Sequence, residues 1–192
     1  MTHNSHINTH SVIPSSVVNG PGKRMVVFFQ GCPLDCAGCF NPDTHSFKEN
    51  TLYTAQEIFD KYYSADNANE GITVSGGEPF MQPRALTELL KTAKETYHLT
   101  TLVYTGFLYE DLIERDITKA ALGFIDALVD GIYIEPEKEP TLLARGSTNQ
   151  RIILLTDRYT EIDLTMPGKV EVIIGADGTV TETGFSDPGI KI

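Results

Sequence analysis

The chain has 192 residues with a net charge of −11, and 41% of its residues are hydrophobic. This length suits one domain with a substantial core, and an acidic chain lacks the basic face that a nucleic-acid binder needs. No apolar run approaches the roughly 20 residues of a membrane helix, and the polar start of the chain has no secretory signal core. Three cysteines cannot form a full disulfide framework, so we expect a cytoplasmic protein that binds neither membrane nor nucleic acid.

The beginning of the chain predicts a flexible polar arm over residues 1–15. Residues 1–10 are rich in Ser, Thr and Asn and contain His3, His6 and His10. Three histidines could bind a metal, but in such a polar stretch we favour a solvated arm.

From residue 24 onward, short apolar runs alternate with helical patterns, which predicts an α/β fold with a mostly parallel sheet. Thr54 with Glu57 forms a capping box before one helix, and Pro83 opens another. A hairpin about Asp177-Gly178 is expected within a C-terminal tail over 166–192. The expected strands are 24–30, 71–74, 99–104, 127–129, 151–155, 170–174 and 179–182, with one or two short helices in 108–124.

All three cysteines lie in one loop, residues 31–42 (GCPLDCAGCFNP), with the spacing C-x3-C-x2-C. Three thiolates can hold three irons of a four-iron four-sulfur cubane, which leaves the fourth iron open to a small molecule. One alternative is a zinc site that His45 completes, although zinc ligands usually come as pairs separated in sequence. The other alternative is a set of buried or incidental cysteines.

A second motif, residues 75–79 (SGGEP), follows the strand at 71–74. Its two glycines let the backbone approach a ligand closely, and Glu78 is biased to an extended conformation because it precedes a proline. A bound amino group could be held by the carbonyls and the carboxylate here. Taken alone, the motif is also compatible with a plain strand-to-helix turn.

Together, the cysteine loop after the first expected strand and GGEP after the second resemble the radical S-adenosylmethionine superfamily. The resemblance implies a partial (β/α) barrel of the radical S-adenosylmethionine type, formed by a single domain over 1–192. Further stretches resemble the activating proteins of glycyl-radical enzymes, and in particular those of the class III anaerobic ribonucleoside-triphosphate reductase. These stretches are 16–22, 28–33, 38–42, 105–107, 129–131 and 145–151.

The resemblance implies an enzyme that reductively cleaves S-adenosylmethionine at one 4Fe-4S cluster. The resulting 5′-deoxyadenosyl radical would generate a glycyl radical on the anaerobic ribonucleotide reductase. The implied partners are this glycyl-radical enzyme subunit and a flavodoxin-type or similar electron donor. The implied cluster ligands are Cys32, Cys36 and Cys39.

The resemblance also implies which residues contact S-adenosylmethionine, and it implies no catalytic acid or base. Gly38, Cys39 and Phe40 would meet the adenine. Many superfamily members carry an aromatic residue just before the third cysteine; this chain departs from that pattern with Gly38, so the aromatic role would pass to Phe40. The implied contacts to the amino group are Gly76, Gly77 and Glu78, and those to the ribose are Tyr104, Thr105 and Asp130. Arg145 would pair with the carboxylate or orient a loop. We expect a structural role for Asn149 and Gln150, and we expect His45 and His98 not to be ligands.

Two rival hypotheses remain from the sequence. One is an enzyme of the same superfamily that acts on a different glycyl-radical enzyme or on a small molecule, such as a deazapurine precursor. The other is a zinc-binding or electron-carrying interaction module without turnover.

Overall fold

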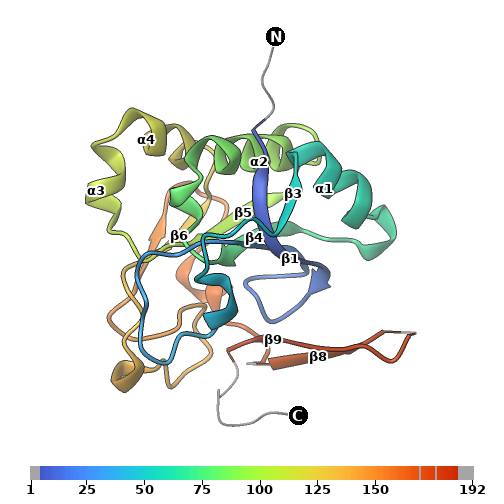
Figure 1. Cartoon of the computed structure of the whole chain (residues 1–192). Helices are drawn as coiled ribbons and strands as arrows, with labels where there is room; N and C mark the ends of the chain where they lie inside the picture. Colours follow the sequence, from blue (N-terminus) through green and yellow to red (C-terminus); the bar gives the residue numbers. More distant parts are fainter. Residues whose placement is uncertain (1–4, 169, 176, 186–192) are drawn as a thin grey trace.

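The computed structural model describes residues 5–168, 170–175 and 177–185, and its centre is one seven-stranded sheet in the order β3-β1-β2-β4-β5-β6-β7 (Figure 1). A separate two-stranded sheet, β8-β9, lies at the C-terminal end of the described chain. The strands are β1 (Ile7–Ser16), β2 (Arg24–Phe29), β3 (Thr51–Tyr53), β4 (Gly71–Gly76), β5 (Thr100–Tyr104), β6 (Ala127–Asp130), β7 (Arg151–Leu154), β8 (Val170–Ile174) and β9 (Val180–Gly184).

The four middle strands of the large sheet are parallel, as the sequence predicted. β2 pairs with β4, β4 with β5, and β5 with β6, all in parallel register. The flanking strands β1, β3 and β7 are antiparallel to their neighbours. The sheet is open, with β3 and β7 at its two edges, so the α/β fold is a partial barrel rather than a closed one.

The N-terminal residues correct one expectation. We expected a flexible arm over 1–15, but Ile7–Ser16 form β1, which pairs with β2 on one side and with β3 on the other. Ile7 and Ile13 are buried, and Thr9 is buried with them. A polar composition hid the strand, because the buried Ile7, Thr9 and Ile13 are separated by the less buried Asn8, His10 and Ser11. His3 lies outside the described residues.

The helices cover one face of the sheet (Figure 1). The predicted capping box is present at the start of α1 (Ala55–Tyr62), where Thr54 and Glu57 bond reciprocally. Pro83 opens α2 (Pro83–Glu95), which buries its apolar stripe against the sheet together with α4 (Asp116–Leu122). The short α3 (Tyr109–Ile113) completes this layer. In the described chain, no helix is long and apolar enough to cross a membrane.

The opposite, concave face of the sheet has its own smaller core. Leu102, Ala127 and Val129 pack there against residues of the C-terminal third of the chain, including Leu164 and Met166. The predicted hairpin is confirmed as β8 and β9, which pair antiparallel around a turn with Gly178 at positive φ. The elements that complete the functional site therefore lie on the concave face, away from the helices.

Asp126, directly before β6, is a buried carboxylate that joins three elements. Its oxygens accept hydrogen bonds from Lys94 Nζ at 2.7 Å, from Thr156 Oγ1 at 2.7 Å and from the Thr101 backbone N–H at 2.9 Å. Burial alone raises the pKa of Asp126, but the bonds from Lys94, Thr156 and Thr101 outweigh it, so the pKa lies below its ordinary value.

We expect Asp126→Asn to lower the free energy of unfolding at neutral pH by about 3 kcal/mol, because it leaves Lys94 beside a neutral group. Because the folded pKa is depressed, this stabilisation is complete above the ordinary pKa of about 3.9 and is lost as the pH falls through the folded pKa. Urea unfolding at neutral and acidic pH measures both effects. The exposed Asp111→Asn is the control and should change the unfolding free energy by less than about 0.5 kcal/mol. An Asp126 effect that is constant with pH would contradict this account.

Candidate metal and cofactor site

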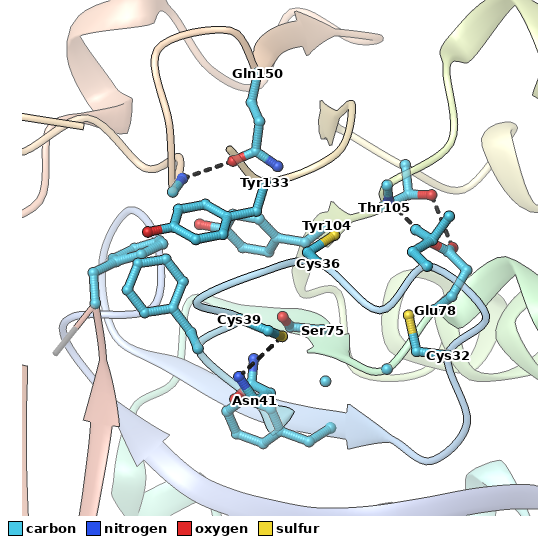
Figure 2. Close-up of a pocket in the computed structure, with 18 of the residues that line it drawn as sticks. Cys32, Cys36, Cys39, Asn41, Ser75, Glu78, Tyr104, Thr105, Tyr133 and Gln150 are labelled. Carbon is cyan, nitrogen blue, oxygen red and sulfur yellow. Dashed lines mark hydrogen bonds between the residues drawn. The ribbon is translucent and has the colours of Figure 1, made fainter. Parts of the chain in front are cut away.

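The three cysteines surround one cavity at the carboxyl ends of the parallel strands. Cys32, Cys36 and Cys39 are free thiols, are partly exposed, and line a cavity of about 190 Å³ (Figure 2). The loop that carries them leaves β2 directly, so the strand end fixes where the loop begins. Ligands of open α/β sheets bind at this edge, where the carboxyl ends of the parallel strands lie together.

The cysteine loop is held by its neighbours rather than by regular structure. Gly31, Asp35 and Gly38 have φ values of 99°, 45° and 67°, which lets the chain reverse tightly between the cysteines. Gln30 Nε2 donates to the carbonyl of Ser46 at 2.7 Å and so ties the start of the loop to its far end. The Asn41 N–H donates to Cys39 Sγ at 3.4 Å, which is a backbone contact to one of the sulfurs.

The glycine-rich turn lies directly beside the cysteine loop, because β2 and β4 are neighbours with Phe29 opposite Gly76. The Gly77 N–H donates to the carbonyl of Phe29 at 2.8 Å, and the Glu78 N–H donates to that of Gly31 at 2.9 Å. Glu78 is extended, as expected for a residue before proline, and its carbonyl accepts a hydrogen bond from the Met81 N–H in a short 3-10 turn. The two sequence motifs therefore form one continuous backbone unit.

The carboxylate of Glu78 is buried and joins this unit to the end of β5. It accepts hydrogen bonds from Thr105 Oγ1 and the Gly106 N–H, both at 2.8 Å, and from the Phe80 N–H at 3.0 Å. Burial raises the pKa of Glu78 to about 7, although these three bonds act in the opposite direction. Near neutral pH, a cationic group placed beside Glu78 would favour its ionised form.

Two glycines of the turn are required by space. A Cβ at Gly77 would lie 2.4 Å from the carbonyl oxygen of Gly31, and one at Gly76 would lie 2.6 Å from the backbone nitrogen of Phe29. Gly76 also has a φ of 99°, a backbone conformation that residues other than glycine rarely adopt. These glycines allow the turn to pack directly against the start of the cysteine loop.

Aromatic side chains from separate segments form one side of the cavity (Figure 2). The Phe40 ring centroid lies 4.8 Å from that of Tyr133 and 5.4 Å from that of Phe185, and Phe185 lies 6.2 Å from Tyr104. The hydroxyl oxygen of Tyr104 is buried and has no hydrogen-bond partner within the described chain. A buried hydroxyl at a cavity is a group for which a bound ligand can supply a partner.

The remaining predicted contacts divide into two groups. Thr105 lines the cavity with Tyr104, Gly76, Gly77 and Glu78, as expected. Gly38, Asp130 and Arg145 do not line it, and the Glu135 side chain lies against Gly38 instead. Asp130 is fully buried and accepts hydrogen bonds from Arg151, including one from Nε at 2.9 Å, and from the Tyr109 N–H. Its side chain therefore supports the rim instead of facing a ribose.

Of the two roles expected for Arg145, the structure fits the second, in which Arg145 orients a loop. Its Nε donates to Glu139 Oε2 at 2.5 Å, and its Nη1 donates to the carbonyls of Thr148 and Gln150. Gln150 accepts hydrogen bonds from the Gly146 and Ser147 N–H groups, donates to the carbonyl of Gly131 at 2.8 Å, and also lines the cavity. The segment around 145–150 is thus an internally bonded loop, with the structural role expected for Gln150.

Sequence reasoning missed several residues that line the cavity: Asn19, Leu34, and Glu182 to Phe185 of the C-terminal hairpin. Asn19 lies in residues 16–22, for which the sequence indicates a family resemblance but no contact with the ligand. The sequence of the C-terminal tail does not indicate that the tail folds back to the cavity. The Asn19 Nδ2 donates to Thr183 Oγ1 at 2.9 Å, which joins the hairpin to the segment before β2.

The donor set of the cavity fits a group larger than one metal ion. Within the described chain, no three His, Cys, Asp or Glu side chains are placed to hold a single ion. His45, the proposed fourth ligand of a zinc site, has its Nδ1 3.4 Å from Asp35 Oδ1. The cavity suits a cluster with an adjoining polar ligand. Three thiols can hold the cluster, while the glycine turn leaves space for the ligand and the buried Tyr104 hydroxyl offers it a hydrogen bond.

Comparison with known proteins gives a consistent result. Residues 18–153 match the family model described as a 4Fe-4S single cluster domain. The chain is 36% identical to the anaerobic ribonucleoside-triphosphate reductase-activating protein of Vibrio cholerae, over 76% of this chain and 97% of that protein. It is 31% identical to the protein of the same name from Escherichia coli, over 75% and 96% of the two chains.

More partial similarities extend to other proteins. The pyruvate formate-lyase-activating enzyme of Clostridium pasteurianum is 41% identical over 52% of this chain and 44% of its own length. The solved structure of QueE from Escherichia coli superposes on 53% of this chain and 52% of its own, with a TM-score of 0.40 and 16% identity.

We expect Gly77→Ala to reduce the iron bound after anaerobic reconstitution and to destabilise the chain by about 1–3 kcal/mol, because its Cβ would press on Gly31 beside Cys32. Iron and sulfide analysis and thermal unfolding measure the two effects. Gly123→Ala is the matched control, since its Cβ would meet only the Ala120 carbonyl oxygen, at 3.6 Å. Equal iron content in the two variants would show that the close contact does not shape the site.

Proposed function

The chain belongs to the family of anaerobic ribonucleoside-triphosphate reductase-activating proteins, and we propose that its cavity is where it generates the glycyl radical of that reductase. Activating enzymes of this kind use an iron–sulfur cluster and S-adenosylmethionine. When bound, and with one electron from the electron donor, the cluster would cleave S-adenosylmethionine to methionine and a 5′-deoxyadenosyl radical, and this chemistry would remove a hydrogen atom from the glycine of the partner.

The observation that carries the proposal is the convergence of three thiols and a glycine-rich turn on one cavity. Cys32, Cys36 and Cys39 would hold the cluster through three irons, which leaves one iron for S-adenosylmethionine. Burial raises the pKa of Cys32 and of Cys39, so without metal these thiols keep their protons and cluster assembly must release them.

The turn at Gly76 to Glu78 is proposed to hold the amino end of S-adenosylmethionine. Gly76 and Gly77 present backbone without side chains to the cavity, and the Glu78 carboxylate offers a negative charge to an ammonium group. The bonds that Thr105 and Gly106 donate to Glu78 fix the direction of this carboxylate. A fixed acceptor orients the ligand at little entropic cost.

The aromatic side of the cavity is proposed to receive the adenosine part. Phe40 and Tyr133 offer flat rings, Cys39 adjoins them, and Tyr104 offers a hydroxyl that lacks a partner within the described residues. In this proposal Asp130 and Arg145 act at a distance, because their bonds hold the loops around the cavity. The protein excludes water and sets geometry, and no acid–base pair of its own is required.

The reductase is the partner that the family implies, and its glycine must come within contact distance of the cavity. We propose a flavodoxin-type electron donor and no role in nucleic-acid binding, in line with the net charge of −11. Three free, partly exposed thiols suit a reducing compartment, so we also propose a cytoplasmic location.

The test is product analysis after anaerobic reconstitution with iron and sulfide and reduction with dithionite. Wild-type protein should convert S-adenosylmethionine to methionine and 5′-deoxyadenosine, and Cys36→Ala should form neither above the level of protein without iron. A Cys36→Ala variant that still activates the reductase would overturn the proposal.

His45→Ala is the control that separates an iron–sulfur site from a zinc site. We expect it to keep its iron and its product formation, because His45 does not line the cavity with the thiols and its Nδ1 lies 3.4 Å from Asp35 Oδ1. A colourless wild-type protein that binds zinc, loses it in His45→Ala and forms no 5′-deoxyadenosine would instead support a structural metal module.

A further inference from the structure

The C-terminal hairpin is an addition to the part of the chain that matches the family. The family model ends at residue 153, before β8 begins at Val170, and the alignment with the Vibrio cholerae protein leaves about a quarter of this chain unmatched. Neither edge of the β8-β9 sheet pairs with another strand in the described chain, and Figure 1 shows the hairpin below the large sheet, on the side away from the helices. The proposed activity does not explain this element.

One face of the hairpin is fixed to the body of the protein. Glu171 accepts a hydrogen bond from the Val17 N–H at 3.2 Å, and its cross-strand partner Thr183 is buried and accepts one from Asn19. Directly after β9, Phe185 packs against Phe40 and Tyr104. These contacts hold the base of the hairpin against the cavity.

The other face of the hairpin is apolar and exposed. Alternation along the strands places Val170, Val172 and Ile174 on this face, with exposed fractions of 41%, 42% and 73%. Val180, which pairs with Ile174, is 55% exposed. A two-stranded sheet with a row of exposed β-branched residues is the kind of surface that another chain covers.

The exposed face leads directly into the cavity. Glu182 and Gly184 are the cross-strand partners of Val172 and Val170, so they belong to the same face, and both line the cavity with the cysteines. Thr183 of the opposite face also lines the cavity, so both faces of the hairpin meet the cavity at the end of β9. The exposed face extends from Ile174 and Val180 at the tip, through Val172 and Glu182, to this end. We call this surface, made of Val170, Val172, Ile174, Val180, Glu182 and Gly184, the hairpin ramp.

We propose that the hairpin ramp docks the glycine-bearing segment of the partner reductase, as an extended peptide with apolar side chains at alternate positions. The proposal rests on the proposed function, which requires a backbone glycine of another protein to enter this cavity. A peptide that follows the ramp reaches the cavity from the tip, and its apolar side chains cover the valines and Ile174. A second copy of this chain would also bury the valines, but it would give no reason for the ramp to end at the cavity.

The test uses the double variant Val172→Ser/Ile174→Ser in the full-length, reconstituted protein. Fluorescence anisotropy with a labelled synthetic peptide that spans the reductase glycine measures docking, and this readout does not require turnover. We expect the affinity for the peptide to fall at least about tenfold, the result of removing two apolar contacts. The glycyl radical signal on the reductase should fall with it, while 5′-deoxyadenosine formation without partner stays at the wild-type rate.

Ile162→Ser is the matched control, since Ile162 is 78% exposed but lies outside the ramp, and it should change none of these readouts. Wild-type affinity and radical transfer in the double variant would overturn the proposal. The proposal would also be overturned if sedimentation showed a dimer for the wild type and a monomer for the double variant, with radical transfer unchanged. If wild-type protein does not cleave S-adenosylmethionine, the proposed function fails, and the peptide titration still decides whether the ramp docks this segment.

Discussion

The parallel pairing of β2 with β4 is the constraint on which the site depends. With Phe29 opposite Gly76, the cysteine loop and the glycine-rich turn leave neighbouring strands at the same level. The backbone of the turn then donates to the carbonyls of Phe29 and Gly31, which is possible only because Gly77 has no side chain there. A shift of this register by one residue would separate the thiols from the turn and remove the cavity.

Buried carboxylates hold the surroundings of the cavity in place. Glu78 connects the turn to the end of β5, Asp130 connects the end of β6 to Arg151, and Asp126 connects the beginnings of β5 and β6 to α2. Each accepts several hydrogen bonds, so the cost of burying the charge is offset within the fold. Glu78 alone of the three also lines the cavity, and it can both support the turn and meet a ligand.

Residues near the two ends of the described chain complete the wall of the cavity. Asn19, ahead of β2, bonds to Thr183 of the hairpin, and Phe185 closes the aromatic side of the cavity against Phe40. The family match covers the cysteines and the glycine turn but ends before the hairpin. The hairpin therefore forms a wall of the cavity that lies outside the family match. Such a wall can differ between family members, and it can fit the cavity to the protein substrate of this chain.

The sequence by itself determined the chemistry and most of the parallel core. Three cysteines at C-x3-C-x2-C and the SGGEP turn identified the site, and apolar runs located β2, β4, β5 and β6, because local spacing and burial patterns encode them. Only the tertiary structure showed that residues 7–16 form a strand, because their polar alternate positions resemble a flexible arm. It also separated Tyr104 and Thr105, which line the cavity, from Asp130 and Arg145, which support it, since hydrogen-bond partners distant in sequence decide where a side chain points. The position of the hairpin could not be predicted from the sequence for the same reason. Its contacts with Val17, Asn19 and Phe40 join segments more than 140 residues apart.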